Sequence, residues 1–160
     1  MFRSDKNMQP EIRLALVVAE FNSELTDKML KRALEYSAEL NVLVTYVCKV
    51  PGSFDMPLMI QTLLEKDDVD AVATLGAIVQ GETRHDEVIG HALAGKIAEL
   101  SLRNRKPVSL GVAGPGMMWE QAEARAEEYA SRSVAAAVKM TLRQRQLQKP
   151  TISAYPMVVE

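Results

Sequence analysis

Four apolar runs alternate along this chain with four stretches of helical periodicity, and that alternation limits the fold more than any other feature. The runs cover residues 12–19, 42–50, 69–75 and 108–112. Several are apolar at nearly every position, which is typical of strands covered on both faces of a parallel sheet. A β-α order repeated four times predicts a parallel sheet with right-handed crossovers and helices on both faces.

Helical spacing marks the segments that follow each run. The pattern predicts helices over 23–40, 56–66, 86–103 and 119 to about 148. Asp55 is a candidate N-cap of the second helix, and Pro57 lies in its first turn. We therefore predict an α/β fold, namely a three-layer αβα sandwich around a four-stranded parallel, flavodoxin-like sheet.

Length, charge and cysteine content narrow the class of protein. The 160 residues fit one domain, 1–160, and we expect its ends, 1–10 and 150–160, to be flexible tails. The net charge of −2 argues against a nucleic-acid partner. Cys48 is the only cysteine, which suits a reducing compartment. We find no signal peptide and no apolar run long enough to cross a bilayer, so we expect a cytoplasmic protein that binds no membrane.

Unusual residues gather where each predicted strand ends. They are Phe21-Asn22, 51–55, 80–85 and Gly114-Pro115-Gly116, after the first to the fourth strand. In open α/β sheets, ligands bind beyond the carboxyl ends of the strands, near the point where the strand order reverses. The four loops should therefore open on the same side of the sheet.

Gly81-Glu82-Thr83 lies between a predicted strand and a predicted helix. Free backbone N–H groups and the helix dipole favour an anion at such a place, and glycine allows close approach. A strand–glycine–helix turn is nevertheless more often structural than functional. Gly114-Pro115-Gly116 is predicted as a second tight turn, but its proline removes one donor. We prefer the first turn as the phosphate-binding site.

His85 follows this turn within the first helical turn. A histidine beside an anion at a strand's carboxyl end is well placed to transfer protons at neutral pH. A surface histidine bonded to Asp86 or Glu87 is an equally good interpretation from position alone. His91, six residues on, faces another side of the helix, so the spacing disfavours a two-histidine metal site. We expect no metal.

Phe21 and Phe54 each lie in a loop just beyond a predicted strand. A loop phenylalanine usually belongs to a small satellite core. Two of them at one mouth could instead enclose a flat heterocycle. Asp55 could bind hydroxyl groups, although capping a helix is at least as good an explanation.

Four blocks of this sequence, in order, resemble the signature of the lumazine synthase family. They are Phe21-Asn22, the octapeptide 50–57, the hexapeptide 81–86, and Glu120-Gln121-Ala122 followed by Arg125. The likeness extends over about residues 12–140. The segments 114–117 and 64–70 resemble archaeal members in particular.

The resemblance implies a site for two small-molecule substrates without a metal or redox cofactor. Phe21, together with Asn22, would hold the pyrimidine ring of 5-amino-6-ribitylaminouracil. The ribityl chain and ring edge would bind to Ser53, Phe54 and Asp55, and the underside of the ring to Ile78 and Val79. The phosphate of 3,4-dihydroxy-2-butanone 4-phosphate would bind to Gly81, Glu82, Thr83 and, across a subunit boundary, Arg125. His85 would transfer protons.

Three residues depart from the family's pattern, and two other functions are alternatives to the one that the resemblance implies. Gln80 replaces a common arginine, Leu110 a phenylalanine that a neighbouring subunit often donates to cover the ring, and Ser133 a lysine. Relatives form pentamers, and many build a hollow icosahedral shell of sixty chains. The rivals are an archaeal-type riboflavin synthase of the same fold, which needs no phosphate site, and a non-catalytic shell or flavin-binding homologue. Retention of 81–85 and Arg125 speaks against the first rival.

Overall fold

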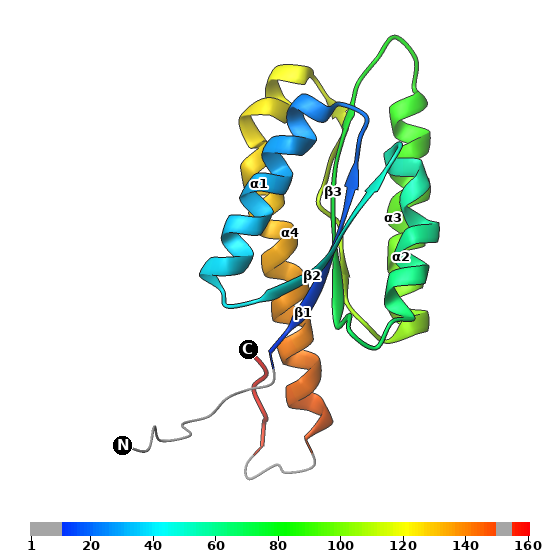
Figure 1. The fold of residues 1–160 in the computed structure, drawn as a ribbon. Coiled ribbons are helices and arrows are strands. Elements are labelled where there is room, and N and C mark those ends of the chain that lie inside the picture. The colour runs from blue at the N-terminus through cyan, green and yellow to red at the C-terminus, as the bar shows by residue number, and fades with distance from the viewer. Residues whose placement is uncertain (1–10, 150–154) are drawn as a thin grey trace.

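The computed structural model describes residues 11–149 and 155–160 (Figure 1). In chain order the elements are β1 (Arg13–Ala19), α1 (Ser23–Glu39), β2 (Leu43–Val50), the short 3-10 helix η1 (Ser53–Asp55), α2 (Met56–Leu64), β3 (Ala71–Val79), α3 (His85–Asn104), β4 (Val108–Ser109), β5 (Val112–Met117) and α4 (Trp119–Gln148). The predicted tail 1–10 and the start of the other, 150–154, lie outside the described residues.

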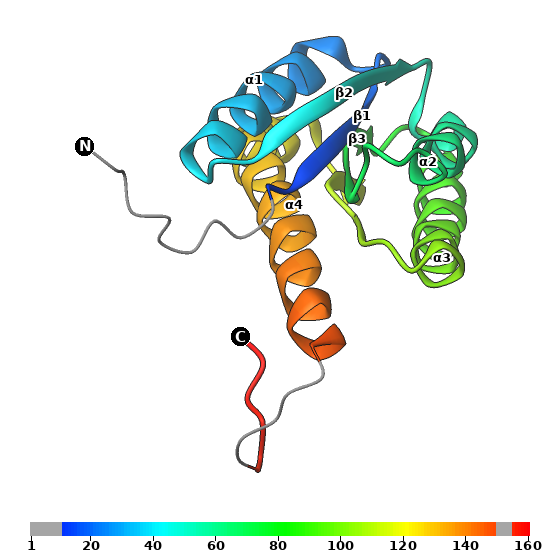
Figure 2. The same ribbon diagram turned by 60° about the horizontal axis from the view of Figure 1, so that its bottom comes forward.

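The elements form three layers around a parallel sheet. The strand order is β2-β1-β3-β4, and β5 also pairs with β3. α1 and α4 cover one face of the sheet, while α2 and α3 cover the other (Figures 1 and 2). β4 pairs with the start of β3 and β5 with its end, so the two short strands occupy one position in the sheet. The predicted αβα sandwich is confirmed.

Burial on both faces explains the continuous apolar runs. In β1, Leu14 and Leu16 belong to the core beneath α1 and α4, whereas Ala15 and Val17 belong to the core beneath α2 and α3. Nearly every position of such a strand is apolar because neither face meets water. The described helices include none that is both long and apolar enough to cross a membrane.

The fourth strand differs from the prediction. It breaks after Ser109 and resumes at Val112, and it then continues through the segment Gly114–Gly116 that was predicted as a turn. That prediction was wrong because it was made from local sequence, where Gly-Pro-Gly favours a turn, whereas an edge strand tolerates these residues. At Gly114 the φ angle is 93°, and an added Cβ would lie 2.1 Å from the backbone oxygen of Ile78. Contact with β3 therefore holds the segment in the sheet.

At this break, side-chain hydroxyl groups make hydrogen bonds in place of the backbone bonds of a regular strand pair. Thr74 Oγ1 donates to the Ser109 carbonyl at 2.7 Å and accepts the Gly111 N–H at 3.0 Å. Ser133 Oγ donates to the Thr74 carbonyl at 2.9 Å. Because buried backbone groups need partners, these bonds make the interruption stable. Leu110 stands at the break with 51% of its surface exposed.

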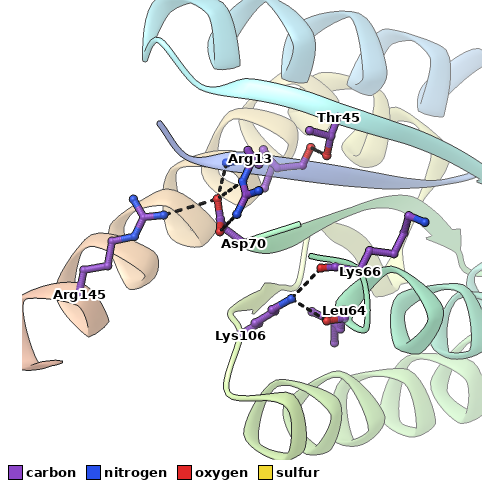
Figure 3. Close-up of polar contacts among 8 residues, drawn as sticks. Arg13, Thr45, Leu64, Lys66, Asp70, Lys106 and Arg145 are labelled. Atoms are coloured by element: carbon purple, nitrogen blue, oxygen red, sulfur yellow. Dashed lines mark hydrogen bonds and ion pairs between the residues drawn. The ribbon is translucent and has the colours of Figure 1, made fainter. Parts of the chain in front are cut away.

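An ion cluster closes the opposite, amino-terminal end of the sheet (Figure 3). The Asp70 carboxylate accepts bonds from the backbone N–H of Arg13 at 2.7 Å and from its Nε at 3.1 Å, and Nη2 of Arg145 lies 3.4 Å away. Burial raises the pKa of Asp70, but the hydrogen bonds from Arg13 outweigh it and hold this pKa below its usual value. The cluster ties the starts of β1 and β3 to the end of α4.

We predict that Asp70→Asn lowers the free energy of unfolding by about 1–3 kcal/mol at pH 7, since it weakens charge-assisted bonds to a largely buried group. The folded pKa of Asp70 lies below the unfolded value. The stabilisation is therefore complete above about pH 4 and is lost as the pH falls through the folded pKa. Urea unfolding at fixed protein concentration and several pH values measures this.

The matched control is Asp27→Asn, because the Asp27 side chain is 65% exposed and lies 3.8 Å from Lys49 Nζ. An exposed pair of this kind contributes little. A gap between wild type and Asp70→Asn that stayed constant from pH 7 to pH 3 would contradict the assigned role of the carboxylate.

Candidate active site

A cavity of about 510 Å³ opens at the carboxyl ends of β1 and β3. The strand order reverses between these two strands, so the cavity lies where ligands bind in open α/β sheets. It is lined by the predicted site residues Phe21, Asn22, Ser53, Phe54, Asp55, Ile78, Val79, Gly81, Thr83 and His85. Pro51, Gly52, Ala77, Asp86 and Ile89 complete the wall.

The loop that carries Phe21 is hydrogen-bonded to the loop that leads to Phe54. The N–H of Glu20 donates to the Val50 carbonyl at 2.7 Å, and the N–H of Phe21 donates to the Pro51 carbonyl at 3.0 Å. These bonds extend the β1–β2 pairing beyond the strands. Phe21 is 73% exposed and Phe54 is 65% exposed. Two exposed rings at one cavity provide the apolar surface that a flat heterocycle requires.

Asn22 links the loop after β1 to β3. Its backbone is left-handed, with φ of 61°, a conformation that asparagine tolerates better than most residues. The side-chain Nδ2 donates to the Ala77 carbonyl at 2.8 Å, and the Asn22 carbonyl accepts the N–H of Leu25 at the start of α1. The amide nitrogen thus has a structural partner, which was not visible from the sequence.

The 3-10 helix η1 lies close against the sheet because β3 has a glycine beneath it. A Cβ added to Gly76 would lie 2.7 Å from Ser53 Oγ. The Asp55 carboxylate accepts the N–H of Gly52 at 2.9 Å. Asp55 does hold the N-cap position of α2, as predicted, but its side chain makes no capping bond to that helix and instead stabilises η1.

The turn from Gly81 to Thr83 is open to an anion. No acceptor from the described part of the chain bonds to the N–H groups of Gly81, Glu82 or Thr83. Thr83 Oγ1 stands 3.4 Å from the His85 N–H, which is long for a hydrogen bond. A Cβ built on Gly81 would meet no atom within 4 Å. Free donors at the positive end of α3 favour a negative group.

His85 is the first residue of α3, and it is exposed. In the described chain, no residue hydrogen-bonds its imidazole, so the alternative of a surface histidine bonded to Asp86 or Glu87 finds no support. Asp86 is instead 6% exposed, and its Oδ2 accepts the N–H of Gly116 at 2.9 Å. The imidazole therefore stands at the cavity with both nitrogens available.

Three predicted site residues do not line the cavity. Glu82 is exposed beside it, Leu110 lies at the break in the edge strand, and Arg125 is exposed on α4. α4 covers the face opposite to α2 and α3 (Figure 2). Arg125 therefore lies on a helix that contributes no residue to the cavity of its own chain.

Ser133, which replaces a common lysine, is buried and bonds the backbone of β3. A polar contact to a ligand is therefore not its task. Asp86 and Ile89 are cavity residues that the sequence did not single out; the only signal was their place on the helix face next to His85. Among residues 11–149 and 155–160, no three His, Cys, Asp or Glu side chains cluster as metal ligands would.

The fold and the cavity define an α/β protein with a pocket at the carboxyl edge of its sheet, where exposed aromatic rings stand near backbone N–H groups to which no described residue bonds. The family model of 6,7-dimethyl-8-ribityllumazine synthase matches residues 11–145. The chain belongs to this family, which is a family of transferases, and the resemblance stated from the sequence is thereby confirmed.

Similar proteins named 6,7-dimethyl-8-ribityllumazine synthase occur in archaea, which confirms the archaeal resemblance. The chain is 54% identical to that of Saccharolobus solfataricus over 139 residues, 87% of this chain and 90% of the relative. It is 50% identical to that of Metallosphaera sedula over 142 residues (89% and 94%). It is 49% identical to that of Pyrobaculum arsenaticum over 138 residues (86% and 92%).

We predict that Gly81→Ala raises KM for the phosphate-bearing substrate by roughly tenfold, because the added methyl group would occupy space in front of free donors. Thermal stability should stay unchanged, since no protein atom lies near the new Cβ. Steady-state kinetics with each substrate varied in turn measures the effect. Gly95→Ala is the control, because its Cβ also meets nothing within 4 Å but lies in mid-helix. Equal KM values in both variants would refute an anion site at Gly81.

Proposed function

We propose that this chain condenses 5-amino-6-(D-ribitylamino)uracil with 3,4-dihydroxy-2-butanone 4-phosphate. The products are 6,7-dimethyl-8-ribityllumazine, phosphate and water, at the penultimate step of riboflavin biosynthesis. The family match supports this reaction and does not favour the riboflavin synthase or non-catalytic alternatives. The observation that carries the assignment is one cavity holding exposed aromatic rings, an open anion turn and an unbonded imidazole.

In this proposal the pyrimidine ring lies against Phe21 and Phe54, with the side chains of Ile78 and Val79 beneath it. The ribityl hydroxyl groups bind around Ser53 and Asp55. Support comes from the exposure of both rings and from the Asp55 carboxylate, which uses Oδ2 for Gly52 and has Oδ1 left for a hydroxyl group. We assign Asn22 to holding Phe21 in place, because its Nδ2 bonds the Ala77 carbonyl.

The phosphate-bearing substrate would bind its anion at Gly81–Thr83. The substrate amine attacks the ketone and water leaves, which forms an imine; phosphate is then eliminated, and the ring closes with loss of a second water. Each step moves a proton, and the ring nitrogens of His85 can donate one proton and accept another. Because an amine and a ketone condense readily once aligned, positioning should supply much of the acceleration.

The test is incubation of the purified protein with both substrates, with phosphate release and lumazine absorbance followed together. We expect stoichiometric formation of phosphate and lumazine. Riboflavin formed from lumazine alone would overturn the proposal in favour of a riboflavin synthase. Binding of the pyrimidine without release of phosphate would indicate a non-catalytic homologue.

We propose further that the chain works in the cytoplasm as a homo-pentamer in which neighbours complete each site. Arg125 is exposed on the face opposite to its own cavity, and Leu110 projects from the edge of the sheet. Neither lines the cavity of its own chain, and in the proposed pentamer each would reach the cavity of a neighbouring subunit. The single thiol of Cys48 suits the reducing compartment. Light scattering of the purified protein would decide whether pentamers stack further into an icosahedral shell.

Sharing of sites between subunits predicts complementation. His85→Ala should slow turnover with little change in pyrimidine binding, and Arg125→Ala should weaken the phosphate substrate. Mixed assemblies of the two variants, refolded together at equal amounts, should regain about one quarter of wild-type activity, because a site then has an even chance of each intact partner. Activity no higher than the mean of the two single variants would place both residues in the same chain's site.

A further inference from the structure

Asp86 is a buried carboxylate that the proposed reaction does not use. It lines the cavity next to His85, and its Oδ2 accepts the Gly116 N–H at 2.9 Å. A carboxylate in the first turn of α3 interacts favourably with the helix dipole, and its bond to a backbone N–H is charge-assisted. Removing one partner of such a buried bond leaves the other unsatisfied.

The segment that Asp86 contacts fits closely between α3 and β3. A Cβ on Gly90, one helical turn after Asp86, would lie 2.7 Å from Pro115 Cδ. On the other side, Gly114 lies against the backbone of Ile78. A side chain would therefore not fit at Gly90 in α3 or at Gly114 in β5, and β5 packs closely against the start of α3.

The region that carries the anion turn and His85 has few other attachments. In the described chain, the Asp86–Gly116 bond is the one hydrogen bond or ion pair that joins residues 81–87 to another strand or helix. Among polar contacts, the position of the imidazole relative to the opposite wall of the cavity therefore depends on this bond, which acts together with the Gly90–Pro115 contact and the packing of Ile89 against the core.

We propose that Asp86 is a positioning residue that fixes His85 and the Gly81–Thr83 turn at the distance the reaction needs. The inference rests on the proposed function and deepens it. Asp86 acts by accepting the Gly116 N–H; its charge strengthens this bond, but an acceptor oxygen at this place is what positions His85. Loss of the acceptor lets the start of α3 shift, which misaligns proton transfer and leaves the wall that holds the pyrimidine intact.

The test compares Asp86→Ala with Asp86→Asn in the full-length assembled protein. Asp86→Ala should lower kcat at least about tenfold while KM for the pyrimidine changes less than about twofold, because small misplacements at a reacting centre are costly. Asp86→Asn retains an acceptor oxygen and should restore kcat to within about threefold of wild type. Gly90→Ala, which pushes on Pro115, should reproduce the kcat loss, whereas Gly95→Ala on the same helix should not.

Wild-type protein that released no phosphate would overturn the proposed function, whereas the variants test the positioning role in an active wild type. Failure of the proposed function and failure of the positioning role are therefore distinguishable. With an active wild type, normal kcat in Asp86→Ala would overturn the positioning role. So would an Asp86→Asn variant, folded by circular dichroism, that is as slow as Asp86→Ala, because this would assign the effect to charge. If Asp86→Ala does not fold, Asp86→Asn and Gly90→Ala still decide between the outcomes.

Discussion

Burial of β1 and β3 on both faces is the constraint on which the rest of this structure depends. These central strands put neighbouring residues into different cores, as Leu16 and Val17 illustrate. Such strands are stable only under two helical layers, and parallel pairing then requires a crossover helix after each one. The crossovers run in both directions from β1, so the ends of β1 and β3 diverge and leave a cavity. The site is thus a consequence of the topology, and its loops need only supply chemistry.

This constraint is also why the sequence predicts so much of the fold. In a run such as 12–19 only Arg13, at its start, is polar, so its pattern alone identifies a central strand. Helices as regular as α1 and α4 have boundaries within a residue or two of those expected. The exception is Gly114–Gly116. Its place in β5 depends on contacts with Ile78 and Asp86, which are distant in sequence, and local turn preference cannot anticipate them.

In the candidate site, too, some features follow from local sequence and others depend on contacts between distant residues. Residues such as Phe21, Phe54 and His85 could be named in advance because they follow strands whose ends must meet at one edge. What the sequence could not reveal is which polar groups are already engaged. Asn22 was expected to bind a substrate and Asp86 follows the predicted proton-transfer residue, yet each bonds a backbone group from a different strand. Only the three-dimensional arrangement separates a side chain that is available from one that holds the site together.

The cavity of a single chain leaves its aromatic rings largely exposed. Burying a phenylalanine contributes about 1.5–3 kcal/mol, so these rings offer binding energy to a ligand or a partner that covers them. Its turn at Gly81–Thr83 offers neutral N–H donors, and the exposed Arg84 follows it directly in the chain. Arg125 lies on α4, which contributes no residue to this cavity, because the two-sided burial of the central strands places α4 on the other face of the sheet from α2 and α3 (Figure 1). In the proposed pentamer a second copy would present its α4 to this edge, and assembly would then be part of the chemistry.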